Sequence, residues 1–71
     1  MSVSKIIELI GSSTKSIEDA VSVAVSRAAL TVKGIQQVEV TKVTATVDEG
    51  RIKEWTVEIR VAFTVLDMIH E

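Results

Sequence analysis

Three carboxylates in the C-terminal half of the chain belong to the residue types that bind hard cations. Glu54 and Glu58 are four residues apart in a segment of strict alternation, which places both on one face of a strand. Asp48 begins the turn before that segment. Carboxylate oxygens suit Ca²⁺ or Mg²⁺, and copies that meet on a symmetry axis would bring two or three such side chains together. A solvated face of alternating charge, continued by Arg60, explains the same spacing, so both interpretations stay open.

A second group of side chains has the chemistry to recognise a planar ligand. The adjacent Gln36 and Gln37 offer amide donors and acceptors, although a surface role for them is equally natural. Trp55 shares the phase of Val57, which predicts that its ring packs against a helix rather than on a ligand. Alternation then places Thr56 on the face opposite to the helix.

No set of residues has the pattern of a catalytic site. The one histidine, His70, is next to the C-terminal residue, where chains fray, so a nucleophile and a base cannot be paired with it. The three glycines, Gly11, Gly34 and Gly50, each adjoin a predicted turn and form no phosphate-binding loop. The sequence therefore predicts a protein that is not an enzyme.

Charge and hydropathy argue against nucleic acid and membranes as partners. Eight Lys and Arg against ten Asp and Glu give a formal net charge of −2, so no basic field is available to bind nucleic acid. Apolar runs are at most three residues long, far short of the roughly 20 apolar residues that span a membrane. The first five residues lack the features of a secretory signal, and we therefore expect a cytoplasmic protein.

The first half of the chain predicts a strand followed by a helix. Residues 3–10 are rich in apolar β-branched side chains and stop at the Gly11-Ser12-Ser13-Thr14 segment, which has the composition of a turn. Ser16 and Asp19 have capping-box spacing, which predicts a helix that begins at Ile17. Apolar residues then recur at helical spacing for about seventeen residues, to Lys33, with Gly34 as the left-handed residue beyond the end.

The second half predicts two long strands. Residues 35–47 are rich in Val and Thr, and the segment 48–50 forms a turn. Residues 51–66 form the third strand, in which residues 54–65 alternate strictly. The apolar phase switches between Val40 and Val43, which predicts a bulge unless both faces are half-buried. The third strand would be about 50 Å long, twice the length of the helix, so it must bend around the helix or extend beyond its own subunit.

These elements define an α+β fold of β-α-β-β order, in which a three-stranded antiparallel sheet curls around one helix. We expect one domain over residues 1–71, with frayed tails at 1–2 and 67–71. A chain of 71 residues without cysteine has no disulfide to stabilise its small core, and its sheet edges are unpaired. Both features predict a closed oligomer made of copies of the chain.

Several segments stand in a distinctive order and spacing. They are Ile7-Glu8-Leu9-Ile10-Gly11-Ser12-Ser13 leading into Ser16-Ile17, then Ala24, Ser26-Arg27-Ala28 and Thr31, then Val38-Glu39-Val40, and finally Trp55-Thr56-Val57-Glu58-Ile59-Arg60-Val61-Ala62-Phe63. Taken together they resemble the dodecin family, small flavin-binding proteins of strand-helix-strand-strand topology that assemble twelve copies into a hollow shell. The resemblance covers Ser4 to about Leu66.

The resemblance also implies a ligand site. In flavin-binding members a tryptophan stacks on the isoalloxazine ring and a glutamine hydrogen-bonds to its edge. Alignment on Val38-Glu39-Val40 places Gln37 at the stacking position, and alignment back from Phe63 places Thr56 at the glutamine position. Both positions depart from the flavin pattern, and the loss of a stacking aromatic is expected to weaken binding by about 1–3 kcal/mol per contact.

The resemblance implies a non-enzymatic protein that binds, stores or sequesters a flavin, either FMN or riboflavin, in pockets between the subunits of a hollow homo-dodecamer. Gln37 and Thr56 would contact the flavin. The alternative is a flavin-independent shell that binds a divalent cation through Glu54, Glu58 and Asp48, binds coenzyme A, or acts as a structural scaffold.

Overall fold

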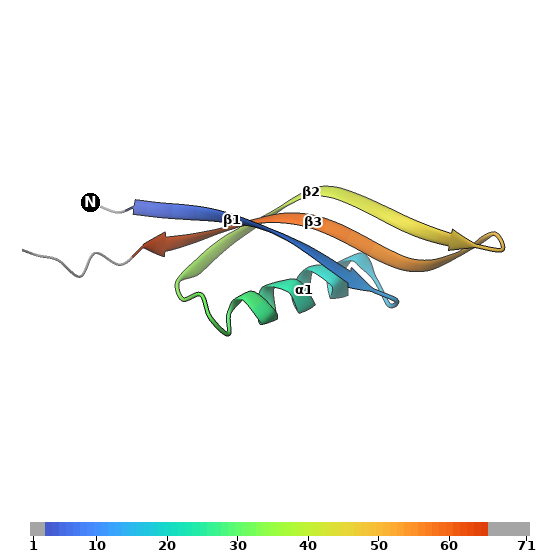
Figure 1. The fold of residues 1–71 in the computed structure, drawn as a ribbon, viewed down its shortest axis with the longest axis horizontal. Coiled ribbons are helices and arrows are strands. Elements are labelled where there is room, and N and C mark those ends of the chain that lie inside the picture. The colour runs from blue at the N-terminus through green and yellow to red at the C-terminus, as the bar shows by residue number, and fades with distance from the viewer. Residues whose placement is uncertain (1–2, 66–71) are drawn as a thin grey trace, which may run out of the picture.

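A curled three-stranded sheet with one helix on one face makes up residues 3–65, the part of the chain that the computed structural model describes (Figure 1). Strand β1 (Val3–Ser13) is followed by helix α1 (Ile17–Ala28), strand β2 (Ile35–Asp48) and strand β3 (Arg51–Val65). β3 lies between β1 and β2 and is antiparallel to both. This confirms the predicted β-α-β-β fold and its antiparallel sheet. The predicted tails at 1–2 and 67–71, and His70 with them, lie outside the described residues.

The core forms where the small residues of α1 meet the central strand. Val57, Ile59 and Val61 of β3 are fully buried and pack with Ala20 and Ala24 of the helix. Alanine on the buried helix face lets the sheet approach closely, and the helix lies against both the edge strand β1 and the central strand β3. The alternation predicted for residues 54–65 is thereby confirmed, whereas nearer the turn a register shift leaves Lys53 as an extra residue of β3. Trp55, predicted to pack against the helix, shares this face, but it is only half-buried and lies outside the buried cluster.

β1 is longer than the sequence predicted, because Gly11 is not a turn residue. The strand continues through Gly11 and Ser12 to Ser13, which pairs with Trp55. A Cβ atom on Gly11 would lie 2.6 Å from the carbonyl oxygen of Ala20 and 2.9 Å from the Cβ of Ala24. The glycine is therefore required by the close approach of strand and helix, which apolar spacing along the chain does not reveal.

We expect Gly11→Ala to lower the free energy of unfolding by about 1–3 kcal/mol, the usual cost of overpacking a close contact. The clash involves helix backbone, so the helix must shift away from β1. Chemical denaturation followed by circular dichroism measures the loss. Gly50→Ala is the matched comparison, because its added Cβ meets no atom within 4 Å and its cost comes only from a φ of +75°. Equal stability of Gly11→Ala and the wild type would contradict the close packing described above.

The start of α1 confirms the sequence prediction, whereas its end does not. The Asp19 amide donates to the Ser16 side chain at 2.9 Å, and the Ser13 hydroxyl donates to the Asp19 carboxylate at 2.7 Å. The helix ends at Ala28 rather than at Lys33. After Ala29 the chain passes through a turn in which the Val32 amide donates to the Ala28 carbonyl at 2.8 Å. The turn is needed because the chain must reverse to enter β2. Within residues 3–65, no helix is long and apolar enough to cross a membrane.

β2 carries the predicted bulge and joins β3 through a tight turn. The register shifts between Val40 and Lys42, which leaves Thr41 as the extra residue and explains the switch of apolar phase. Glu49 and Gly50 have φ values of 52° and 75°, the left-handed geometry of a two-residue hairpin turn. β2 therefore extends one residue further than predicted, to Asp48.

The fold is flat and elongated rather than round. Its principal extents are 61 × 20 × 12 Å and its radius of gyration is 15.2 Å, whereas a compact chain of this length has a radius of about 11 Å. The far end of the β2–β3 hairpin projects beyond both α1 and β1 (Figure 1). The long third strand thus continues past the end of its helix (Figure 1), and its extension beyond its own subunit stays a prediction.

Candidate functional site

The sheet face that points away from α1 is polar and open. Cross-strand pairing arranges its side chains in rows, each with one residue from β1, one from β3 and one from β2. The rows are Ile6–Ala62–Gln37, Glu8–Arg60–Glu39, Ile10–Glu58–Lys42 and Ser12–Thr56–Thr44. Charges of opposite sign stand next to each other in the second and third rows, so the face has hydrogen-bonding groups without a strong net field.

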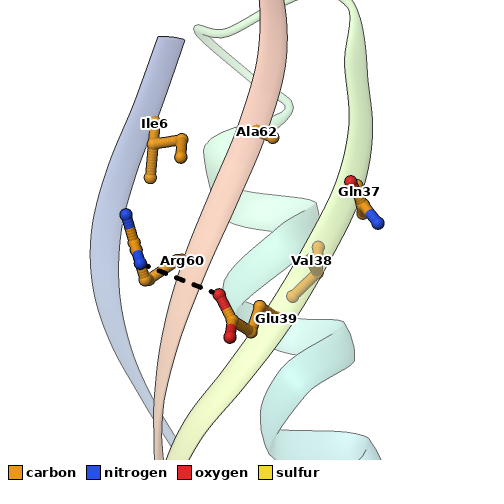
Figure 2. A pocket seen from close by; sticks show the side chains of 6 residues that line it. All are labelled: Ile6, Gln37, Val38, Glu39, Arg60 and Ala62. Atoms are coloured by element: carbon orange, nitrogen blue, oxygen red, sulfur yellow. Dashed lines mark ion pairs between the residues drawn. The ribbon is translucent and has the colours of Figure 1, made fainter. Parts of the chain in front are cut away.

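A recess of about 400 Å³ lies at the end of this face nearest the start of β2. Figure 2 shows the six residues that line it, which are Ile6, Gln37, Val38, Glu39, Arg60 and Ala62. The small side chain of Ala62 and the apolar side chain of Ile6 leave room between the strands, while amide, carboxylate and guanidinium groups surround them. The recess therefore combines apolar contact area with several donors and acceptors, as small-molecule sites do.

One ion pair crosses the recess. Arg60 Nη1 lies 3.9 Å from Glu39 Oε1, and the two side chains are 45% and 67% exposed. An exposed pair at this distance contributes little to stability. The Arg60 guanidinium consequently keeps N–H donors available for a ligand that enters the recess.

The structure places the two residues expected to contact a flavin on the same sheet face but not in the same site. Gln37 lines the recess and pairs with Ala62, whereas Thr56 accepts or donates a hydrogen bond of 3.3 Å with the Ser12 hydroxyl. Ala62 and Thr56 are six positions apart in β3, which corresponds to about 20 Å along the strand. One copy of the chain therefore brings only one of these residues to a given ligand.

The three candidate cation ligands also lie apart within one copy. Glu58 stands opposite Lys42, Asp48 opposite Arg51, and Glu54 opposite Thr46. Glu54 and Glu58 share the outward face, as alternation predicted, but about 13 Å of strand separates them. Among the residues that the structure describes, no group of three His, Cys, Asp or Glu side chains is close enough to hold a metal ion. Convergence of these carboxylates would need more than one copy.

Sequence reasoning missed the side chains that complete the recess. Ile6 comes from β1, at the other end of the chain, and Glu39 from β2, and only the register brings them beside Arg60. The outward phase of Glu8 and Ile6 in β1 would have been a usable signal, but the apolar pattern of β1 does not alternate cleanly. The register in which β1 and β2 pair with β3 is therefore the information needed to predict the recess.

The described residues thus form a strand-helix-strand-strand unit with an open polar sheet face. A sequence model described as Dodecin matches residues 3–66. The Dodecin of Thermus thermophilus is 34% identical over 59 residues, which cover 83% of this chain and 86% of that relative. The chain belongs to the dodecin family, a family of ligand-binding proteins.

Solved structures agree with this assignment. A Thermus thermophilus protein superimposes with a TM-score of 0.90 at 31% identity, covering 96% of this chain and all of the other. Dodecin from Streptomyces coelicolor gives a TM-score of 0.87 at 27% identity, covering 93% and 94% of the two chains. A calcium dodecin from Mycobacterium tuberculosis, described as calcium chelating, gives 0.78 at 32% identity, covering 99% and 100%.

Proposed function

We propose that this chain forms a hollow homo-oligomer, a dodecamer, that binds and stores a small planar ligand without chemical conversion. A flavin, riboflavin or FMN, is the first candidate. The observation that carries this proposal is the recess around Gln37 on the open sheet face, at the position that the family resemblance gives to the flavin-stacking residue. The cytoplasmic location stays a prediction.

The burial pattern supports self-assembly. Among the described residues only six hydrophobic residues are buried, and three of them are alanines. Eleven large hydrophobic residues are exposed, among them Ile10 at 71% and Val47 at 61%. A single copy thus shields little apolar surface relative to what it exposes, whereas contact with other copies would cover the remainder.

The separation of Gln37 and Thr56 supports a site shared between copies. Each residue lies on the outward face, and about 20 Å of strand separates them within one chain. If two such faces oppose each other around a twofold axis, Gln37 of one copy lies near the ligand bound by the other. The same arrangement would present every ligand contact twice.

A fluorescence titration tests the ligand. Riboflavin and FMN are each added to the purified assembled protein, and flavin emission is followed at micromolar protein. We expect a change in emission that saturates, together with a rise in its anisotropy, because a bound flavin leaves water and rotates with the whole assembly. Unchanged emission for both flavins would rule out a flavin function while leaving the assembly intact.

A divalent cation is the second candidate, because a relative 32% identical to this chain is a calcium dodecin. The proposed ligands are Glu54, Glu58 and Asp48, brought together between copies. We expect added Ca²⁺ to raise the melting temperature of the assembly and chelation to reverse the rise. Coenzyme A, the third candidate ligand, is tested in the same melting-temperature experiment.

Glu58→Gln separates a cation site from a solvated face. Glu58 is exposed and stands opposite Lys42, so without Ca²⁺ its replacement is expected to cost well under 1 kcal/mol. With Ca²⁺ present, the variant is expected to lose the thermal shift that the wild type shows. Glu49→Gln, at the hairpin turn, is the matched control. An unchanged thermal shift in Glu58→Gln would remove this residue from any cation site.

A further inference from the structure

The recess on the open sheet face has an apolar part and a charged part. Ile6 and Ala62 are partners in one row of the face and offer apolar surface. Glu39 and Arg60 are partners in the next row toward the hairpin and offer a carboxylate beside a guanidinium. Successive rows are two residues apart, which corresponds to about 7 Å along the strand. A flat ring that lies on Ile6 and Ala62 therefore directs one edge toward the charged pair.

The charged pair has hydrogen-bonding capacity that its two members do not use on each other. Arg60 Nη1 and Glu39 Oε1 are 3.9 Å apart, which is longer than a hydrogen bond. Figure 2 shows the Arg60 side chain extending from β3 toward β1 and the Glu39 carboxylate pointing toward it. A guanidinium only donates and an ionised carboxylate only accepts. The pair thus presents a donor and an acceptor next to each other along one side of the recess.

A donor beside an acceptor matches the edge of an amide or imide. Such an edge presents an N–H beside a carbonyl oxygen, so a carboxylate accepts from the N–H while a guanidinium donates to the oxygen. The isoalloxazine ring has this edge on its pyrimidine side, where one N–H lies between two carbonyls. Its opposite edge carries methyl groups and no N–H. Hydrogen bonds with one charged partner are stronger than neutral ones, so the charged pair distinguishes the two edges.

We propose that Glu39 and Arg60 recognise the imide edge of the bound ring, with Glu39 accepting from the N–H and Arg60 donating to a neighbouring carbonyl oxygen. This inference rests on the proposed ligand-binding function and adds the residues that determine its specificity. The ligand class is a planar heterocycle with an N–H beside a carbonyl. Thr56, to which the resemblance gives the contact with the ring edge, is six positions from Ala62, or about 20 Å along β3. Within one copy, the edge contact therefore belongs to a different pair of residues.

Glu8 provides a matched control for Glu39. It is the partner of Arg60 on the other side, in β1, but it lines a separate recess. Replacement of either glutamate by methionine removes one carboxylate beside Arg60 and keeps an unbranched side chain. Only Glu39 lines the recess that contains Gln37. The two variants therefore separate a direct contact with the ring from a general change of charge on the sheet face.

Riboflavin and riboflavin methylated at the imide nitrogen test the proposal. The methyl group removes the N–H and keeps the ring planar. Loss of one hydrogen bond to a charged group corresponds to about a ten- to hundredfold loss of affinity. We expect the assembled wild type to bind riboflavin at least tenfold more tightly than the methylated form, measured by fluorescence anisotropy. Glu39→Met is expected to bind both forms alike, and Glu8→Met to keep the wild-type preference.

Arg60→Met separates the two hydrogen bonds of the pair. Its loss removes the donor to the carbonyl oxygen, which riboflavin and the methylated form share. We therefore expect a lower affinity for both compounds and an unchanged ratio between them. In Glu39→Met the ratio itself changes, which a merely structural role of Glu39 would not produce. Circular dichroism of each variant shows whether it is folded.

Three outcomes would overturn the edge assignment while the proposed function stands. The first is equal binding of the two compounds by wild-type protein that binds riboflavin. The second is loss of the preference in Glu8→Met to the same extent as in Glu39→Met. The third is loss of the preference in Thr56→Val but not in Glu39→Met, which would give the edge to Thr56 of another copy. Failure of the wild type to bind riboflavin at all would instead remove the proposed flavin function, and this inference with it.

Discussion

Replacement of Val61 by Asp is expected to abolish folding. Val61 is completely buried at the centre of β3 and packs with Ile59, Ala20 and Ala24 in the only extensive core of the described residues. A carboxylate at this position would have no polar partner, because the neighbouring side chains are apolar. Burial of an unpaired charge costs several kcal/mol, and a fold with so small a core has little stability to lose.

Circular dichroism and sedimentation of Val61→Asp measure this effect. We expect loss of the helical signal together with loss of assembly. Val61→Ala is a graded comparison, with an expected loss of about 2–3 kcal/mol from removed contacts and the cavity left behind. Arg60→Gln, on the outward side of the same strand, should cost less than 1 kcal/mol. A folded and assembled Val61→Asp protein would contradict the assignment of the core.

Replacement of Gln37 by Trp is expected to raise the affinity for riboflavin or FMN by one to two orders of magnitude. Gln37 is exposed on the rim of the recess, so an indole there has room to cover a planar ring. Stacking on an aromatic side chain is worth about 1–3 kcal/mol per ring, and each 1.4 kcal/mol is a factor of ten. A site shared around a twofold axis would gain the contact twice.

Fluorescence titration of Gln37→Trp against the wild type provides the measurement. Gln36→Trp is the matched control, because Gln36 is the extra residue of a register shift and does not line the recess. It is expected to leave the flavin affinity unchanged. Equal affinities in Gln37→Trp and the wild type would show that the recess is not where the ring binds.

The strict alternation of β3 made the fold predictable. Trp55, Val57, Ile59 and Val61 lie on one face of the strand, and only this face is apolar enough to pack against a helix. The strand register, the core and the hairpin therefore follow from the alternation. The bulge at Thr41 was predictable for the same reason, because the apolar phase changes across it. In contrast, Gly11 begins a segment whose composition is typical of a turn. Only the short distance from a Cβ at this position to the carbonyl oxygen of Ala20 shows that the glycine is needed for the contact between β1 and α1.

The candidate site was harder to predict because its residues come from three strands. Gln37 was identified through the resemblance, but Glu39, Ile6 and Arg60 become neighbours of it only through pairing. Thr56 lies too far from Gln37, and Glu54, Glu58 and Asp48 lie too far from one another, to form either site in a single chain. Their role depends on the placement of other copies, which the sequence of one chain does not specify.

Analytical ultracentrifugation of the wild-type protein tests the central claim most directly, namely that one copy is incomplete and functions only among others. We predict a single closed species of about twelve times the 7.7 kDa chain mass, with bound flavin sedimenting at the same rate when it is added. A folded, stable species of one chain at micromolar concentration would contradict the account.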